Sequence, residues 1–149
     1  MDVCGVLCSR NRKKPRLTLR PFDDQRQPRI WLETLSFSLV LTLIETGEVS
    51  LIHSPIHDLE NRRNPFALRR HWVDKCLRLG TREVELTPVI KSRALALEQS
   101  GCKALDALHL SCAEAAGADQ FLTCDDRLLR RYSGQMTVQN PVTFITSLT

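Results

Sequence analysis

The sequence predicts an α/β fold in which helices cover the faces of a parallel β-sheet. Segments of strand-like sequence alternate along the 149-residue chain with longer segments of helical periodicity. Strands that are separated by helices usually pair in parallel, because each connection crosses back over the sheet. Hydrophobic residues make up 42% of the chain and charged residues 26%, as in an ordinary globular domain. The length suits a single domain with a core of its own.

The first half of the chain is expected to begin with a weak strand at 3–7 and a loop at 20–28. A helix at 29–46 follows Pro28, a residue that suits a helix entry, and its leucines recur at steps of four behind Trp31. Gly47 suits the position just past the end of that helix. The remaining elements predicted for this half are a strand and two helical stretches, at 48–54, 55–60 and 66–79.

The second half contains a clear helix start at Thr87 and Pro88. A capping hydroxyl there precedes a proline at the first helical position, and the helix is predicted to run to about Gln99. The other elements predicted for this half are a short strand, a helix, a strand, a short helix and a last strand, at 82–86, 103–116, 119–124, 125–132 and 136–145. Strands and helices thus alternate to the end of the chain.

The positive charge of the chain comes from its first segment. The formal net charge is +4, but residues 1–20 hold six basic side chains and one acidic one, whereas the other 129 residues hold 15 basic and 16 acidic ones. A basic arm can bind nucleic acid, and a solvated tail is the alternative. We therefore divide the chain into an atypical basic N-terminal segment, 1–19, and a domain at 20–149.

A cytoplasmic protein without a membrane partner is the expectation. The six cysteines include no Cys-x-x-Cys pair, which favours reduced thiols in an intracellular protein. No signal peptide is visible, because the charges follow the first short apolar run instead of preceding it. The most apolar stretch, 35–44, lies between Glu33 and Glu45 and is too short to span a bilayer.

Three acidic side chains are predicted to meet at one edge of the sheet. Asp106 lies in the first turn of helix 103–116, and Asp125 follows strand 119–124. Taken singly, each suits the start of a helix, Asp106 beside the helix dipole and Asp125 as a cap. The helix, a glycine turn and the strand bring both to the carboxyl edge, where Glu60 also follows its strand. Asp58 is the competitor of Glu60.

Clustered carboxylates repel one another unless a cation lies between them. Hard oxygen ligands without a matching set of His and Cys suit Mg²⁺ or Mn²⁺. His109 lies near Asp106 on the same helix, and we interpret it as a packed or hydrogen-bonded structural histidine. His53 and His57 are assigned no metal.

Two segments resemble the PIN-domain family, to which the VapC-like toxin nucleases belong. "DALHLSCAEAAGADQFLTCDDRLLRR" is similar to the C-terminal half of that family, and "LIHSPIHDLENRRNP" resembles its second acidic motif. The resemblance covers about residues 20–149. It implies a three-layer sandwich with a central parallel sheet flanked by helices, four acidic residues, Mg²⁺ or Mn²⁺, and cleavage of single-stranded RNA. Its motifs match Glu60, Asp106 and Asp125, with Asp126 as a further candidate ligand.

The first acidic motif of the family has no counterpart here. The family carries an aspartate at the end of its first strand, but no acid occurs from Ser9 to Leu19. Asp23 or Asp24 could replace it, the activity could be lost, or residues 1–19 could differ from the native start, which the charge change at residue 20 favours. The leading hypothesis is a metal-dependent endoribonuclease of toxin–antitoxin type.

Two other hypotheses are kept beside the nuclease. The first is a catalytically impaired PIN-like module that binds RNA or protein through basic faces around four arginines, Arg62, Arg63, Arg69 and Arg70. The second is a scaffold whose apolar helix 29–46 docks a second copy or an antitoxin, although such faces usually belong to the core.

Overall fold

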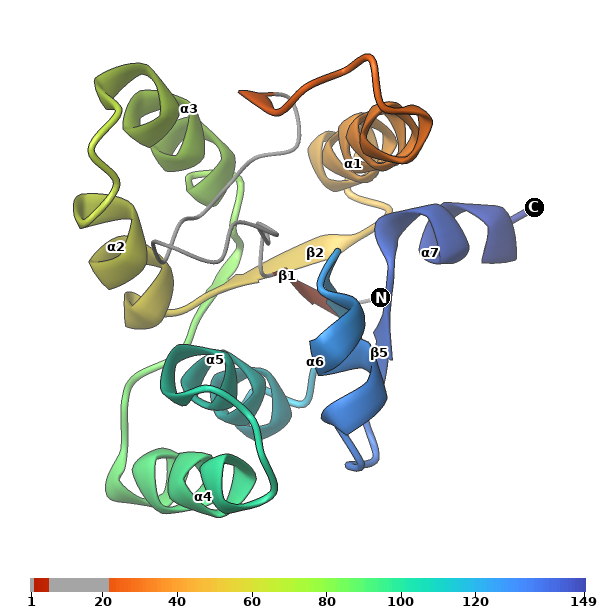
Figure 1. Ribbon diagram of the computed structural model, residues 1–149. Coiled ribbons are helices and arrows are strands. Elements are labelled where there is room, and N and C mark those ends of the chain that lie inside the picture. Colours follow the sequence, from red (N-terminus) through yellow and green to blue (C-terminus); the bar gives the residue numbers. More distant parts are fainter. Residues whose placement is uncertain (1, 6–21) are drawn as a thin grey trace.

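The computed structural model describes residues 2–5 and 22–149 and confirms the α/β class. Its strands form a parallel sheet in the order β3-β2-β1-β4-β5 (Figure 1). The strands are β1 Asp2–Gly5, β2 Ser50–His53, β3 Arg82–Glu83, β4 Gln120–Leu122 and β5 Thr137–Gln139, and the last four are shorter than the sequence predicts. Each strand pairs with its neighbours over two or three residues in register.

The helices lie close to where the sequence predicts them. Their bounds are α1 Pro28–Glu45, α2 Pro55–Arg62, α3 Ala67–Leu77, α4 Pro88–Gln99, α5 Ala104–Ala115, α6 Asp126–Arg131 and α7 Pro141–Ser147. The exception is α7, because the predicted strand at 136–145 is wrong beyond Gln139. Asn140 caps the helix instead, accepting a 2.9 Å hydrogen bond from the amide of Val142, and Pro141 takes the first helical position.

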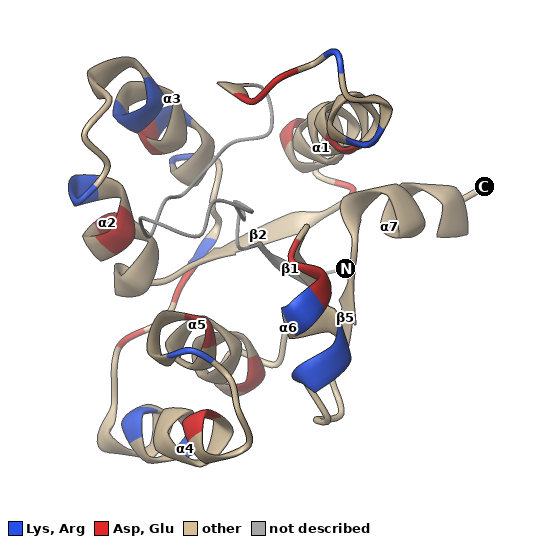
Figure 2. Ribbon diagram, viewed as in Figure 1, with Lys and Arg blue, Asp and Glu red and all other residues tan. Residues whose placement is uncertain are grey.

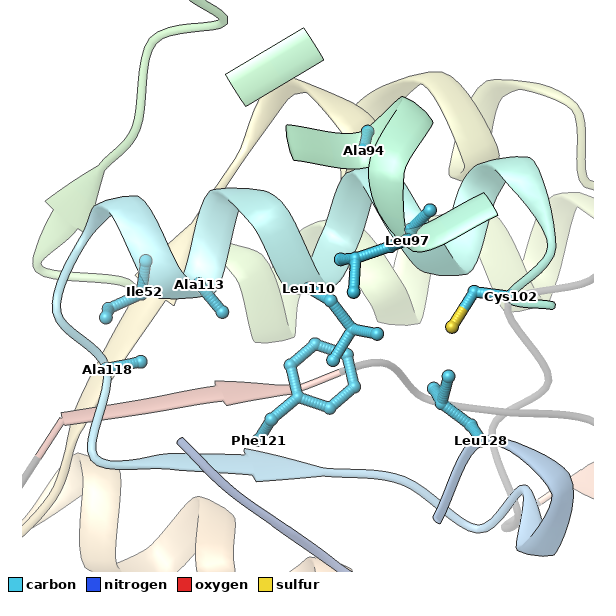
Figure 3. Close-up of a cluster of buried hydrophobic side chains, with 10 residues drawn as sticks. Ile52, Ala94, Leu97, Cys102, Leu110, Ala113, Ala118, Phe121 and Leu128 are labelled. Atoms are coloured by element: carbon cyan, nitrogen blue, oxygen red, sulfur yellow. The ribbon is translucent and has the colours of Figure 1, made fainter. Parts of the chain in front are cut away.

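Helices cover both faces of the sheet. Phe121 of β4 packs in a cluster with residues of α4 and α5, and the next residue, Leu122, packs with residues of α1 and α7. Successive side chains of a strand point to opposite faces, so one strand serves both clusters. Figure 1 shows α4 and α5 together on one side of the strands and α1 and α7 on the other, and Figure 3 shows Phe121 beside Leu110 in the first cluster.

Helix α5 is buried on two faces. A stripe that contacts α2 and α4 is only partly buried, except for Cys112, and consists of Leu105, Leu108, Cys112 and Ala116. A second stripe faces the sheet and is fully buried: Ala107, Leu110 and Ala113. The helix lies between the sheet and α4, so small residues are needed on the sheet side to allow a close approach.

Helix α1 turns much of its apolar surface outward. Trp31, Leu35 and Leu39 are 50%, 42% and 51% exposed, whereas Val40 and Ile44 contact the core. The interpretation of the Trp31 stripe as core is therefore wrong, because α1 is apolar on several sides and the sheet covers only one. No helix in the part of the chain that the structure describes has the length and hydropathy needed to cross a bilayer.

Strand β1 lies between β2 and β4 in the middle of the sheet. It includes residues 3–5 of the strand that the sequence predicts at 3–7, and residues 6–7 lie outside the described part. The segment 1–19 therefore supplies a strand to the sheet, although the sequence places this segment outside the domain. The rest of the basic segment, with the stretch from Ser9 to Leu19, also lies outside the described residues.

Candidate metal centre

The carboxyl ends of the parallel strands bring three helix ends to one edge of the sheet. Helix α2 follows β2, and α6 follows β4. Helix α5 precedes β4, and the chain reverses between them at Gly117, whose φ of +67° is a conformation that favours glycine. Strand β4 then runs back along α5 toward the start of that helix. The start of α5 therefore meets the start of α6. Figure 2 shows acidic segments on α2, α5 and α6.

Asp106 is the central acid of this edge. It lies in the first turn of α5 and is partly buried. Burial raises the pKa of its carboxyl above the ordinary value, and the negative charge of Asp125 and, more weakly, of Glu60 raises it further. His109 and Lys103 act in the opposite direction. Asp125 and Glu60 are therefore close enough for their charges to act on Asp106.

Asp125 and Asp126 are adjacent but have different roles in the fold. Oδ1 of Asp125 accepts a 2.8 Å hydrogen bond from the amide of Arg127, so Asp125 is the cap of α6 that the sequence allows. The Asp126 carboxylate binds both terminal nitrogens of Arg29, at 2.6 and 2.9 Å. Asp126 is thus held by a structural ion pair with α1, which weakens its case as a further ligand.

Glu60 is buried, with 7% of its surface exposed, and is not a solvated acid of the helix surface. Its Oε2 lies 3.0 Å from Nε2 of His109, which is 1% exposed. Asp58 lies on the outside of α2, where its Oδ2 is 3.0 Å from Nε2 of His53. Glu60, and not Asp58, is therefore the acid of α2 that interacts with Asp106.

The carboxyl end of β1 is the place where a first-strand acid would stand. Strand β1 ends at Gly5, and the sequence has no Asp or Glu from Val6 to Phe22. Asp24 is exposed in the loop before α1, and its carboxylate accepts hydrogen bonds of 2.9 and 3.1 Å from the Arg26 side chain. This local pair lowers the pKa of Asp24.

Glu33 is a buried acid outside the set of acids that the sequence predicts for the site. It is 1% exposed, and its Oε1 accepts hydrogen bonds of 2.8 Å from Nε of Arg29 and from Nδ2 of Asn140. The three residues come from α1 and the cap of α7, and Arg29 extends the network to Asp126. The signal in the sequence was an arginine four residues before a glutamate in an otherwise apolar helix.

The donor chemistry of the edge fits a hard divalent cation. Glu60, Asp106 and Asp125 offer carboxylate oxygens, the ligands that a hard divalent cation prefers. Within residues 2–5 and 22–149, however, no three His, Cys, Asp or Glu side chains already stand close enough together to enclose an ion. The residues present thus fit such an ion by type, but their arrangement here is open.

A cavity of about 560 Å³ lies at the other end of β4. Its walls include Arg93, Glu114, Asp119 and Tyr132, and none of the predicted site residues lines it. Glu114 accepts two hydrogen bonds from Arg93, at 2.7 and 3.0 Å, and one of 2.7 Å from the Tyr132 hydroxyl. These polar groups satisfy one another, so we interpret the network as structural.

The fold and the edge define a parallel α/β protein with acidic side chains grouped where its strands end. A family model of the PIN domain matches residues 19–134, which is more than half of the chain. The chain therefore belongs to the PIN domain family, as its motifs suggest. A comparison with curated proteins finds no match. PIN domains have a nuclease-type fold, generally use divalent metal ions and generally bind RNA.

Proposed function

We propose that this chain is a metal-dependent endoribonuclease of toxin–antitoxin type, similar to the VapC-like toxins, that cleaves single-stranded RNA. The observation that carries the proposal is that the charges of Asp125 and Glu60 act on the buried Asp106 at the edge of the sheet, in a chain of the PIN family. We further propose that the domain at 20–149 has the family's three-layer arrangement around a central sheet. Strand β1, which precedes residue 20, would then be a strand of that sheet contributed by the segment 1–19.

Glu60, Asp106 and Asp125 would hold Mg²⁺ or Mn²⁺. A bound divalent ion activates water and offsets the charge that develops on a phosphodiester. The chain's own part is to keep the three carboxylates on separate, packed helices, α2, α5 and the start of α6. Lys103, whose charge acts on Asp106, stands beside the edge where a phosphate would approach.

The test is cleavage of a labelled single-stranded RNA in Mg²⁺ or Mn²⁺. Asp106→Asn and Asp125→Asn are expected to lose cleavage. Asp119→Asn, which changes an exposed carboxylate just before the amino end of β4, is the matched control and should keep it. Equal cleavage by the wild type and both site variants would overturn the proposal.

The alternative is a catalytically impaired module that binds RNA or protein. It is supported by the lack of an acid from Val6 to Phe22, after the end of β1. Arg62 and Arg63 are exposed, whereas Arg69 and Arg70 donate hydrogen bonds to the carbonyls of Phe22 and Asn64. This function predicts RNA binding that persists in a chelator and in Asp106→Asn. Binding that requires a divalent ion would exclude it.

The proposed partners beyond RNA are a second copy of the chain and an antitoxin protein. The exposed apolar residues of α1 support a protein partner, because large apolar patches on a surface often mark an interface. The proposed location is the cytoplasm. The buried cysteines Cys76, Cys102 and Cys112 are free thiols, as is usual in a reducing compartment.

A further inference from the structure

Glu60 and His109 form a buried hydrogen bond that joins α2 to α5. Nε2 of His109 lies 3.0 Å from Oε2 of Glu60, and the two residues are 1% and 7% exposed. They are 49 positions apart in the sequence. A hydrogen bond to a charged carboxylate is stronger than one between neutral groups, and its loss leaves a buried acceptor unsatisfied. The hydrogen bond therefore fixes the orientation of the Glu60 carboxylate and also holds α2 against α5.

The ring of His109 packs against the ring of His57. Their ring centroids are 4.7 Å apart, and His57 is 1% exposed. Nδ1 of His57 accepts a 3.1 Å hydrogen bond from the amide of Ser54, at the point where β2 leads into α2. This hydrogen bond fixes the orientation of the His57 ring. Because the His57 ring has a fixed orientation, its contact with His109 helps to hold the His109 ring in place.

His109 acts in this arrangement as a donor. A carboxylate only accepts hydrogen bonds, so the proton of the contact belongs to Nε2. Nδ1 of His109 is buried and has no hydrogen-bond partner among the described residues. The contact of Nε2 with Glu60 is thus the hydrogen bond through which the His109 side chain acts.

We infer that His109 is a positioning residue that holds the Glu60 carboxylate beside Asp106 for divalent-ion binding. This inference rests on the proposed function and adds a residue to it. Carboxylates that bind ions are generally oriented by hydrogen bonds from residues that do not touch the ion. A carboxylate that must find its orientation on binding gives up side-chain entropy, and His109 removes that requirement.

The test measures the affinity of the full chain for Mn²⁺ by titration calorimetry. His109→Phe keeps an aromatic ring against His57 but removes the donor, and should weaken Mn²⁺ binding roughly 10–100-fold. His109→Gln places an amide nitrogen near the position of Nε2 and should restore part of the affinity. His109→Asn is too short to do so and should bind as weakly as His109→Phe.

Ser111→Ala is the matched control. Ser111 is 1% exposed on the same helix, and its hydroxyl donates only to the carbonyl of Ala107, so this variant should bind Mn²⁺ like the wild type. If His109→Phe does not fold, the comparison of His109→Gln with His109→Asn decides the question. Equal affinity of these two folded variants would overturn the inference.

A double-mutant cycle separates positioning from a general effect on the fold. In the background of Glu60→Gln, His109→Phe should cause little further loss of Mn²⁺ affinity, because its effect passes through Glu60. A full further loss would overturn the inference. If the wild type itself binds no Mn²⁺, the proposed function fails and the inference with it. If the wild type and His109→Phe bind equally well, only the inference fails.

Discussion

Arg29 and Asp126 form a two-point ion pair, with Nη2 2.6 Å from Oδ1 and Nη1 2.9 Å from Oδ2. The Nε atom of the same guanidinium lies 2.8 Å from Oε1 of the buried Glu33. These contacts raise the pKa of Arg29. A single arginine thus joins α1 to the start of α6, directly beside Asp125. This arrangement makes Arg29 a structural residue of the candidate site.

Arg29→Ala is expected to lower the free energy of unfolding by about 3 kcal/mol, because a buried acid loses its charged partner. The measurement is urea unfolding followed by circular dichroism. Arg26→Ala is the control, since Arg26 pairs with Asp24 on the exposed surface and its removal should leave the stability nearly unchanged. Equal effects of the two substitutions would show that the Arg29 network does not stabilise the fold.

Asp106→Asn is expected to stabilise the protein at neutral pH while removing its activity. The pKa of Asp106 is raised in the folded state, so the folded chain binds a proton more tightly there than the unfolded chain does. Stability therefore falls as the pH rises through the raised pKa and recovers as the pH is lowered. The substitution removes a buried charge and its repulsion by Asp125, and Tm at neutral pH should rise by about 2–4 °C.

The thermal unfolding of both proteins across acidic and neutral pH checks this expectation. Asp119→Asn again serves as the control, because its exposed carboxylate should have little effect on Tm. A lower Tm for Asp106→Asn at neutral pH would contradict the conclusion that the acids repel one another. It would then follow that Asp106 stabilises the start of α5, as an isolated acid in the first turn of a helix does.

The titration of Tyr132 tests the network at the far end of β4. Burial raises the pKa of Tyr132 to about 12, and Glu114 contributes through its hydrogen bond and its charge. The chain has one tyrosine, so the ultraviolet absorbance of tyrosinate reports this side chain alone. In Glu114→Gln the pKa should move toward the ordinary value of 10.0. An unchanged titration would show that Glu114 has no effect on the hydroxyl.

The direction in which the stability of the fold changes with pH follows from the same raised pKa of Tyr132. A raised pKa of Tyr132 means that stability is fully present below the ordinary value and is lost as the pH rises toward 12. Glu114 has a lowered pKa, chiefly because of Arg93, so its contribution is present above the ordinary carboxyl value and is lost in acid. Glu114→Gln should reduce the dependence of stability on pH at both ends.

The outward face of α1 should control self-association. Leu35→Glu and Leu39→Glu place a charge on residues that are 42% and 51% exposed, so they should leave the fold intact. If the proposed homodimer uses this face, both variants should sediment as monomers at concentrations where the wild type is larger. Val89→Glu, at a residue of α4 that is 77% exposed, is the control. Identical sedimentation of all four proteins would exclude this face.

The alternation of strands and helices was predictable from local signals. Glycines past helix ends and the Thr87–Pro88 start marked most boundaries. The missed helix α7 carries the same signal, a polar cap at Asn140 followed by Pro141, but the run of β-branched residues around it favoured a strand. The order of elements therefore followed from the sequence, whereas strand lengths did not, because pairing with neighbouring strands sets them.

Topology alone predicts that Glu60, Asp106 and Asp125 lie at one edge of the sheet, and their role as ligands stays a proposal. Their partners were not predictable, because the contacts of His109 with Glu60 and of Arg29 with Asp126 join residues 49 and 97 positions apart. Such pairs depend on how helices pack across the sheet. The outward stripe of α1 was missed for a related reason: a helix that is apolar on several sides does not show which side faces the core.

The position of a bound ion tests the central claim most directly. Crystals of the protein soaked in Mn²⁺ can be examined for anomalous scattering, which locates manganese independently of the protein. We predict an ion coordinated by carboxylate oxygens of Asp106 and Asp125, with Glu60 in the same site and Asp126 still bound to Arg29. Manganese bound elsewhere, or no manganese between Asp106 and Asp125, would contradict the assignment of this edge as the metal centre.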